Sequence, residues 1–252
     1  MNAPPSQFGR IAKEYEKGRR AYDFNAMEYV CALIRKASNK DHPLVLDLGC
    51  GTGISTRQLY QNRIQVVGCD KDEKMIDVAR KHDSSIVYTV GDSQDLRFCK
   101  DYFDAVTAFG AFHWFTDVES IVNIQHVTKR RGIFAVINKN DTGDFRQIFD
   151  ESLNDAIGFV PRHAKLNYNP VKSLRERLFA DVKEATFDGF EMYDLDEVLM
   201  LCQSLNAWNS VPEGKRRKVL DELRKNFSAR LRSEFYTRTI ETVVVSGVNN
   251  KR

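Results

Sequence analysis

Short apolar runs alternate with amphipathic stretches through the middle of the chain. The runs have the length and β-branched content of buried strands, and the stretches carry apolar residues at helical spacing. The predicted strands cover residues 43–48, 64–69, 86–90, 103–109 and 132–138, and the predicted helices lie near residues 54–61, around 75–79 and around 118–124. Five such βα units predict an α/β fold with a doubly wound, mostly parallel sheet.

The pattern differs on both sides of this core. Two helical patterns precede it, and after it the alternation stops. There the chain reads as helical over 141–180 around an interrupting loop at 159–170, strand-like over 183–194, helical over 194–205 and 215–232, and as a closing strand at 235–247, paired antiparallel at the sheet edge. We therefore expect three regions: cap helices over 1–40, the sheet core over 41–140, and a helical cap with closing edge strands of the same domain over 141–252.

The composition fits a globular protein of this kind. Of 252 residues, 42% are hydrophobic and 29% are charged, and no apolar run approaches the roughly 18 to 20 residues needed to span a bilayer. The first ten residues lack the apolar core of a secretory signal. The five cysteines form no CxxC pair and no zinc-type spacing with histidine. We expect a cytoplasmic protein with reduced thiols, no metal site and no membrane span.

Positive charge is concentrated near the end of the chain. The net charge is +3, but residues 213–238 hold nine Lys or Arg against four Asp or Glu, a local charge of +5 that leaves −2 for the rest. Apolar residues recur in this segment at helical spacing, which predicts an amphipathic helix with a solvated basic face. A basic rim that steers an acidic substrate is the alternative. No aromatic platform is interleaved with the charges, so we expect no nucleic-acid partner.

The segment VLDLGCGTGIS joins the first predicted strand to the first predicted helix. Its glycines, Gly49, Gly51 and Gly53, let the backbone approach a ligand closely, and the helix that follows offers unpaired N–H groups. A dinucleotide fingerprint, G-x-G-x-x-G/A, does not fit, because its third position is Ile54 in one register and Thr56 in the other. No G-x-x-x-x-G-K-[ST] phosphate loop is present either. The turn therefore predicts a cofactor without phosphate groups.

Acidic residues at three successive strand ends narrow the choice of cofactor. Asp47 precedes the glycines, where its charge would repel a pyrophosphate and attract an ammonium or a sulfonium. Asp70, at the end of the second strand, can accept hydrogen bonds from both hydroxyls of a ribose. Asp92, after the third strand, can accept a hydrogen bond from the exocyclic amine of adenine. Each aspartate alone is also typical of an ordinary turn, but the set indicates S-adenosyl-L-methionine.

The successive segments VLDLGCGTG, VVGCDKDEKMI, VGDSQDL and FDAVTAFGAFHWF carry a resemblance to a known family. In their order and spacing they resemble the motifs of class I S-adenosylmethionine-dependent methyltransferases, over about residues 40–140. YEKGRRAY, AFHWF and SLNAW…FYTRTIETVVV resemble the small-molecule branch of trans-aconitate methyltransferase and methyltransferase type 11. That branch often has R-P-x-Y-P near its start, of which this chain keeps Arg19 and Tyr22. The resemblance implies a Rossmann-like methyltransferase fold, with the cofactor bound by the 41–140 core.

The resemblance also implies which residues hold the cofactor. It places the glycine turn against the methionine part, Asp70 on the ribose, a lysine and a methionine beside the adenine, an Asp-Ser pair at the adenine edge, and a Phe-Gly pair beside the sulfonium. Two residues of the first helical pattern would close over the carboxylate end. The set is Tyr15, Arg19, Asp47, Gly49, Cys50, Gly51, Gly53, Asp70, Lys71, Met75, Asp92, Ser93, Phe109 and Gly110. For Met75 a place in the core is the alternative, because helical methionines among apolar neighbours are usually packed inside.

Methyl transfer from a sulfonium asks for positioning and desolvation more than for chemistry by the protein. An ionised carboxylate acceptor needs no base, whereas a phenol, enol or carbon acid does. His113, just past the fourth strand, is the candidate base or substrate hydrogen-bonding group; a histidine that supports the loop is the alternative. The place after the fourth strand reads AFGAFHW and lacks the [ND]-P-P-[YF] motif, which disfavours methylation of nucleic-acid bases or amides.

These residues predict an S-adenosylmethionine-dependent methyltransferase that acts on a small organic molecule. The preferred reaction is O-methylation of a carboxylate or hydroxyl, and an acidic acceptor is one option. Two alternatives stay open: a quinone-type C-methyltransferase, and a noncatalytic S-adenosylmethionine-binding or scaffold protein.

Overall fold

The apolar runs along the chain pair into one seven-stranded sheet. A computed structural model describes residues 8–160, 168–177 and 179–251. The strand order is β3-β2-β1-β4-β5-β7-β6. The strands are β1 (Leu44–Leu48), β2 (Gln65–Asp70), β3 (Val87–Val90), β4 (Phe103–Phe109), β5 (Thr128–Asp141), β6 (Phe179–Tyr193) and β7 (Tyr236–Asn249). The α/β fold class predicted from the sequence is confirmed.

The first five strands are parallel, and their order creates a switch point beside β1. Leu46 of β1 pairs with Val67 of β2 on one side and with Val106 of β4 on the other. The chain therefore moves outward from β1 to β3 and then returns to form β4 and β5. In open sheets of this type, ligands bind at the carboxyl ends of the strands beside such a point. One predicted repeat is incomplete, because residues 91–102, between β3 and β4, form a loop without a helix.

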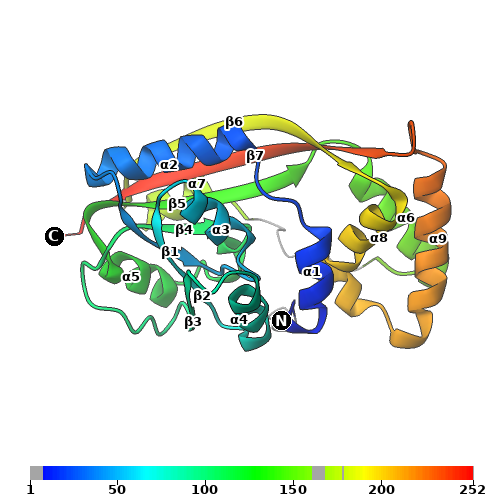
Figure 1. Ribbon diagram of the computed structural model, residues 1–252, viewed down its shortest axis with the longest axis horizontal. Coiled ribbons are helices and arrows are strands. Elements are labelled where there is room, and N and C mark those ends of the chain that lie inside the picture. Colours follow the sequence, from blue (N-terminus) through cyan, green and yellow to red (C-terminus); the bar gives the residue numbers. More distant parts are fainter. Residues whose placement is uncertain (1–7, 161–167, 178, 252) are drawn as a thin grey trace. The chain divides into compact units, whose positions relative to one another are not determined.

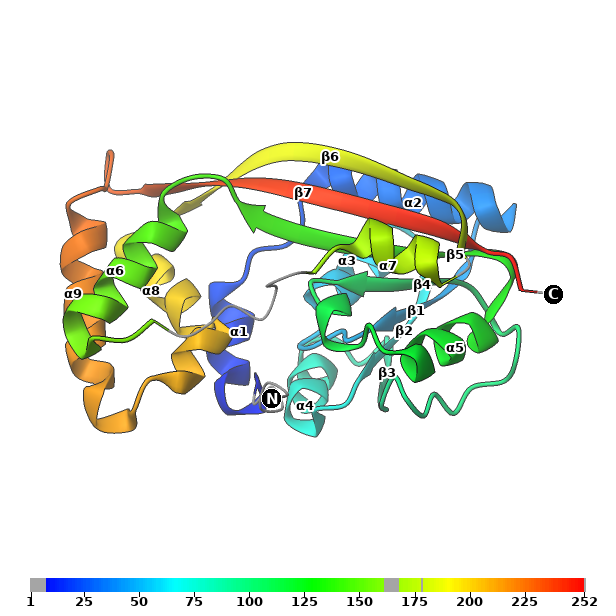
Figure 2. The ribbon, with the colours of Figure 1, turned by 180° about the vertical axis from the view of Figure 1, so that it is seen from behind.

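Helices cover both faces of the parallel strands, as Figures 1 and 2 show from opposite sides. Residues of α2, α3 and α4 share one apolar cluster with one face, and residues of α5 and α7 share a second cluster with the other. The α-helices are α1 (Ala12–Gly18), α2 (Phe24–Ser38), α3 (Ile54–Gln61), α4 (Glu73–His82), α5 (Val118–Val127), α6 (Phe145–Ile157), α7 (Pro170–Glu176), α8 (Leu195–Gln203) and α9 (Arg216–Ser228). Short 3-10 helices are η1 (Phe8–Ile11), η2 (Phe112–Trp114), η3 (Asn206–Ser210) and η4 (Glu213–Lys215).

Aspartates fix where several of these helices begin. The side chain of Asp23 accepts hydrogen bonds from the first backbone N–H groups of α2, and Asp72 and Asp117 do the same for α4 and α5. Asp194 and Glu197 form a capping box at the start of α8. Such caps satisfy N–H groups that have no partner inside the helix, so these short polar residues set the helix boundaries.

The sequence predicted that the closing strand lies at the sheet edge, and this prediction was wrong. β7 lies between β5 and β6, and β6 forms the edge. In Figure 1 the chain runs along β7 in the direction opposite to β5 and β6. The burial pattern explains the order: β7 ends in a run of buried residues, whereas β6 alternates between exposed and partly buried positions, as an edge strand does.

The described chain divides into two compact units. Unit 1 holds residues 8–20, 140–160 and 188–241, and unit 2 holds residues 21–139, 168–177, 179–187 and 242–251. Unit 2 contains the parallel strands. Unit 1 has its own apolar core, built from α6, α8 and α9 with η1 and η3. A cap over the strand ends stays a prediction. Within the described residues, no helix is long and apolar enough to cross a membrane.

Candidate active site

The glycine turn after β1 is held against the end of β2 by its backbone. The N–H groups of Gly49 and Cys50 both donate to the carbonyl oxygen of Cys69, at 2.8 and 3.1 Å. Gly49 has φ +71°, and a Cβ there would lie 2.5 Å from the Cβ of Ala111. Gly53, the N-cap residue just before α3, has φ +84°. Because side chains rarely adopt this left-handed conformation, the turn needs glycine at both positions.

Asp47 lies beneath this turn and is fully buried. Its Oδ1 accepts a hydrogen bond from Thr107, and its Oδ2 accepts from Ser55 and Thr56, at 2.7–2.9 Å. The carboxylate therefore ties β1 to α3 and β4. Burial, only partly offset by these hydroxyl donors, raises the pKa of Asp47 to about 6. Contact between Asp47 and a cofactor stays a prediction.

The raised pKa of Asp47 makes a pH-dependent contribution to stability. Its folded pKa of about 6 lies above the ordinary 3.8, so its stabilisation is complete below pH 3.8 and is lost as pH rises through 6. A shift of this size corresponds to about 3 kcal/mol. We expect Asp47→Asn, which does not titrate, to gain about that much stability relative to the unmodified protein between pH 4 and 7, measured by urea unfolding.

Asp104 provides a control in which the contribution to stability changes with pH in the opposite direction. Burial alone would raise its pKa, but hydrogen bonds from Lys129, from the Leu44 N–H and from Lys40 outweigh it and hold the pKa below the ordinary value. Its stabilisation is present above the ordinary pKa and is lost as pH falls. Asp104→Asn should therefore lose stability relative to the unmodified protein as pH rises. Equal pH dependence for both variants would contradict the prediction.

Asp70 stands at the end of β2, beside the turn. Its Oδ2 accepts a hydrogen bond from the Gly51 N–H and its Oδ1 accepts from the Asp72 N–H, both at 2.9 Å. Burial raises the pKa of Asp70. The structure thus brings this predicted ribose-binding residue into direct contact with the predicted glycine turn. Each carboxylate oxygen keeps a second lone pair that can accept from a ligand.

The predicted adenine residues follow β2 and β3. Lys71 is exposed, and Met75 is buried on the first turn of α4. The Gly91 N–H donates to the Asp70 carbonyl at 3.0 Å, which sets the β3 loop beside the end of β2. In that loop Asp92 is exposed, and the Ser93 hydroxyl is buried against Ser120 at 2.9 Å. Adenine contacts by these four predicted residues stay predictions.

The end of β4 places Phe109 and Gly110 on the other side of the turn. The Gly110 N–H donates to the Ile137 carbonyl at 2.7 Å, and Gly110 has φ +62°. The ring of Tyr22 packs edge-on against Phe109 with centroids 4.9 Å apart, and its hydroxyl would lie 3.3 Å from a Cβ on Gly110. Tyr22 is a site candidate that the sequence prediction missed. Its retention in the partial R-P-x-Y-P match was the available signal.

His113 belongs to a cluster at the carboxyl ends of β4 and β5. Its ring centroid lies 4.8 Å from that of Trp114 and 5.8 Å from that of Tyr168. The Nδ2 of Asn138 donates to the Tyr168 hydroxyl at 3.4 Å. We call this set the β4–β5 cluster: Phe112, His113, Trp114, Asn138 and Tyr168. The sequence prediction included only His113 as a catalytic candidate, because Asn138 and Tyr168 belong to no motif.

Tyr15 and Arg19 belong to unit 1, not to the unit that contains the glycine turn. The guanidinium of Arg19 donates to the Ser204 hydroxyl at 2.9 Å and lies over the Tyr15 ring at 5.2 Å. Closure of these two residues over the cofactor stays a prediction. Arg162 and His163, in the loop predicted at 159–170, lie outside the described residues.

The basic segment 213–238 is partly neutralised within unit 1. Arg224 pairs with Asp196 at 3.0 Å, and Arg230 pairs with Asp144 at 3.4 Å. Arg238 is only 3% exposed and is bonded to Asp141 and Glu191, at 2.5 and 2.8 Å. These ion pairs favour the interpretation of the basic segment as a structural, solvated surface. They argue against a basic rim that steers an acidic substrate.

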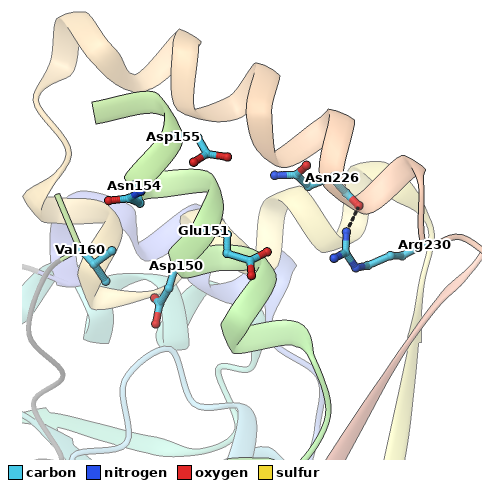
Figure 3. Close-up of a pocket in the computed structure, with 7 residues that line it drawn as sticks. All are labelled: Asp150, Glu151, Asn154, Asp155, Val160, Asn226 and Arg230. Carbon is cyan, nitrogen blue, oxygen red and sulfur yellow. Dashed lines mark hydrogen bonds between the residues drawn. The ribbon is translucent and has the colours of Figure 1, made fainter. Parts of the chain in front are cut away.

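Unit 1 also contains an open hollow of about 500 Å³ between α6 and α9, shown in Figure 3. Its lining consists of Asp150, Glu151, Asn154, Asp155, Val160, Asn226 and Arg230. In Figure 3 the guanidinium of Arg230 points to the backbone of Asn226, to whose carbonyl it donates at 3.1 Å. Three carboxylates would repel an acidic acceptor, and none of the residues predicted to form the site lies here.

Part of the chain resembles known proteins. Residues 46–136 match the family described as "Methyltransferase domain". A Mycobacterium tuberculosis protein named as an uncharacterized methyltransferase is 29% identical over 151 residues, 60% of this chain and 58% of its own. The demethylmenaquinone methyltransferase of Thermotoga maritima is 30% identical over 52% of this chain and 58% of its own. The chain thus spans under three fifths of these relatives.

A solved structure supports the fold. A protein of Anaeromyxobacter dehalogenans superimposes with a TM-score of 0.67 at 16% identity, covering 91% of this chain and 97% of its own. At this identity the likeness concerns the fold alone.

Proposed function

We propose that the chain is a class I S-adenosylmethionine-dependent methyltransferase, a proposal supported by the methyltransferase-domain match over residues 46–136, and that it transfers the methyl group of S-adenosyl-L-methionine to a carboxylate or hydroxyl oxygen of a small organic acceptor. The observation that carries this proposal is the contact between the glycine turn and Asp70. The Gly51 N–H is bonded to the Asp70 carboxylate, at the switch point of the sheet. The glycine turn, whose backbone a ligand can approach closely, meets the Asp70 carboxylate there. A nucleoside that carries a cationic group needs this combination.

The residues present fit this cofactor. At Gly49 a Cβ would overlap the Cβ of Ala111, so no side chain can enter the turn. We propose that the turn from Gly49 to Gly53 holds the methionine part and that Asp70 holds the ribose. We further propose that Lys71, Met75, Asp92 and Ser93 surround the adenine. No phosphate has to be accommodated beside the buried charge of Asp47.

The protein's own contribution is then positioning. The bound cofactor supplies an activated methyl group on a sulfonium. Phe109 and Gly110, at the end of β4, orient the acceptor side, and the Tyr22 ring packed on Phe109 helps to exclude water. Holding two reactants in line and desolvating them accounts for most of the rate enhancement expected for a displacement of this kind.

A quinone-type C-methyltransferase is the second candidate. The Thermotoga maritima demethylmenaquinone methyltransferase, 30% identical over 137 residues, favours it. A carbon acceptor would need a base, and His113 of the β4–β5 cluster is the residue available beside Tyr168. A cytoplasmic location and the absence of a nucleic-acid partner stay predictions from the sequence.

Methyl-labelled S-adenosylmethionine tests the proposal directly. The full chain is offered di- and tricarboxylic acids, fatty acids, phenols and quinols, and each product is treated with mild alkali. Label released as methanol identifies a methyl ester and a carboxylate acceptor. Label that resists alkali identifies an ether or a carbon product, and only the carbon product contradicts O-methylation. Failure to bind S-adenosylmethionine would sink the whole proposal.

For a carboxylate acceptor we expect His113→Ala to lower kcat less than about tenfold, because an ionised carboxylate needs no general base. The measurement is kcat on the best acceptor of the panel. His126→Ala, a change at an exposed position of α5, is the matched control. A general base contributes about 10²- to 10⁴-fold. A loss of that size in His113→Ala alone would instead identify a phenol or carbon acceptor.

A further inference from the structure

We propose that the Tyr168 hydroxyl binds the acceptor by donating a hydrogen bond to a carboxylate oxygen, and that Asn138 is the positioning residue that orients this hydroxyl. The inference rests on the proposed methyltransferase function and names the substrate class of the same site. Neither residue belongs to a motif of the sequence, and the two are 30 positions apart.

Asn138 carries an unsatisfied polar atom in a buried place. It lies near the carboxyl end of β5 and is 4% exposed. Its Nδ2 donates to the Tyr168 hydroxyl at 3.4 Å, whereas its Oδ1 has no hydrogen-bond partner among the described residues. A buried polar atom without a partner is costly and calls for an explanation. Because a carboxylate only accepts hydrogen bonds, a water bound with the acceptor beside Tyr168 would supply the missing donor.

The direction of the Asn138–Tyr168 bond determines what Tyr168 can do. Because the Tyr168 oxygen accepts from Asn138, its own proton remains to be donated to another group. Burial also raises the pKa of Tyr168 to about 12, so the hydroxyl stays protonated at neutral pH. Tyr168 is thus a donor rather than a base. A donor of this kind suits an oxygen that is already negatively charged.

The backbone of Asn138 adjoins the residue proposed to lie beside the transferred methyl group. The carbonyl of Ile137, the residue before Asn138, accepts the Gly110 N–H at 2.7 Å. The Tyr168 ring stands 5.8 Å from the His113 ring and 6.0 Å from the Phe112 ring. An acceptor at this pair would therefore meet aromatic groups and a hydrogen-bond donor beside Gly110.

The composition of the β4–β5 cluster points to the acceptor's class. None of its five members carries a carboxylate, so the cluster itself does not repel an anion. Its rings favour a flat apolar body, and its donor favours a carboxylate at the end of that body. The acceptor class is therefore a carboxylic acid with an aromatic or unsaturated body.

Binding of 2-naphthoate to the full chain saturated with S-adenosylhomocysteine tests the pair, by isothermal titration calorimetry at pH 7.5. Tyr168→Phe removes the donor, and Asn138→Asp turns the Tyr168 proton toward the new carboxylate. We expect each variant to raise the Kd for 2-naphthoate at least about tenfold. The Kd of the double variant for 2-naphthoate should not exceed the higher Kd of the two single variants, because both substitutions remove the same interaction.

Controls separate binding from structural damage. Tyr102→Phe, which removes a hydroxyl from an exposed ring, should leave the 2-naphthoate Kd unchanged. The neutral 2-naphthamide should lose less than 2-naphthoate in Tyr168→Phe, since its oxygen carries no full charge. The Kd for S-adenosylhomocysteine should stay within about twofold in every variant, as expected for a change outside its site.

Three results would overturn the inference. They are absence of saturable 2-naphthoate binding to the unmodified protein, an unchanged Kd in Tyr168→Phe, and a parallel loss of S-adenosylhomocysteine affinity. The labelled-methyl assay tests the proposed function separately from this binding measurement. If 2-naphthoate behaves as expected but no acceptor is methylated, the proposed function falls and the binding pair stands.

Discussion

Gly49→Ala should abolish tight binding of S-adenosylmethionine and destabilise the protein. The new Cβ would lie 2.5 Å from the Cβ of Ala111, and the residue would keep φ +71°. A left-handed conformation costs a side chain about 1 kcal/mol, and overpacking adds about 2 kcal/mol. We expect the free energy of unfolding to fall by about 3 kcal/mol and the Kd for the cofactor to rise about hundredfold. Urea unfolding and calorimetry measure the two effects.

Two other glycines separate strain from steric overlap. Gly158 has φ +68° and no atom within 4 Å of an added Cβ, so Gly158→Ala tests the left-handed conformation alone. Gly214→Ala involves neither strain nor overlap. No atom lies within 4 Å of an added Cβ, and the φ of Gly214 is not in the left-handed range. The order of destabilisation should be Gly49, then Gly158, then Gly214. Cofactor affinity in Gly49→Ala equal to that of Gly158→Ala would contradict a role of the turn in binding.

Asp70→Asn should raise the Kd for S-adenosylmethionine about hundredfold, because a hydrogen bond to a charged acceptor contributes about 1.5 to 3 kcal/mol. The carboxylate already accepts the Gly51 and Asp72 N–H groups, and its remaining lone pairs are the ones proposed for the ribose hydroxyls. The substitution therefore weakens both the turn and the ribose contact. Isothermal titration calorimetry with S-adenosylmethionine provides the measurement.

A ligand that lacks one of the two ribose hydroxyls distinguishes the two roles of Asp70. The 2′-deoxy analogue of S-adenosylhomocysteine should lose less affinity in Asp70→Asn than S-adenosylhomocysteine itself, because it has only one hydroxyl contact left to lose. Asp23→Asn is the matched control, since Asp23 also accepts backbone N–H groups, at the start of α2, and asparagine caps helices equally well. Equal losses for both ligands would mean that Asp70 acts only by holding the turn.

Much of the parallel core was predictable from residue order. The strands β1 to β5 and the helix α3 arise from local patterns: apolar runs of strand length, and a helix that begins after Gly53. The helix predicted after β2 was located through Met75 and its neighbours, and its actual start at Glu73 is fixed by Asp72. These features depend on interactions between residues close in sequence, which a single sequence displays.

Other assignments depended on which distant residues meet. Arg238 lies in a basic segment of the sequence, yet it is buried with Asp141 and Glu191. The pattern of β7 identified a strand but not its place between β5 and β6, because strand order is set by pairing over long sequence separations. No local signal separates a buried ion pair from an exposed charge.

The sequence by itself determined the strands, the glycine turn and the aspartates at the strand ends, because turn geometry and strand periodicity are local properties of the chain. Only the tertiary structure decided that Asp47 is bonded to three hydroxyls. It also decided that Asn138 meets Tyr168 across 30 positions. The burial of a polar residue and its hydrogen-bond partners depend on how helices and strands pack together. Packing therefore decides whether such a residue holds two elements together, as Asp47 does, or has a hydrogen-bond donor left for a ligand, as we propose for Tyr168.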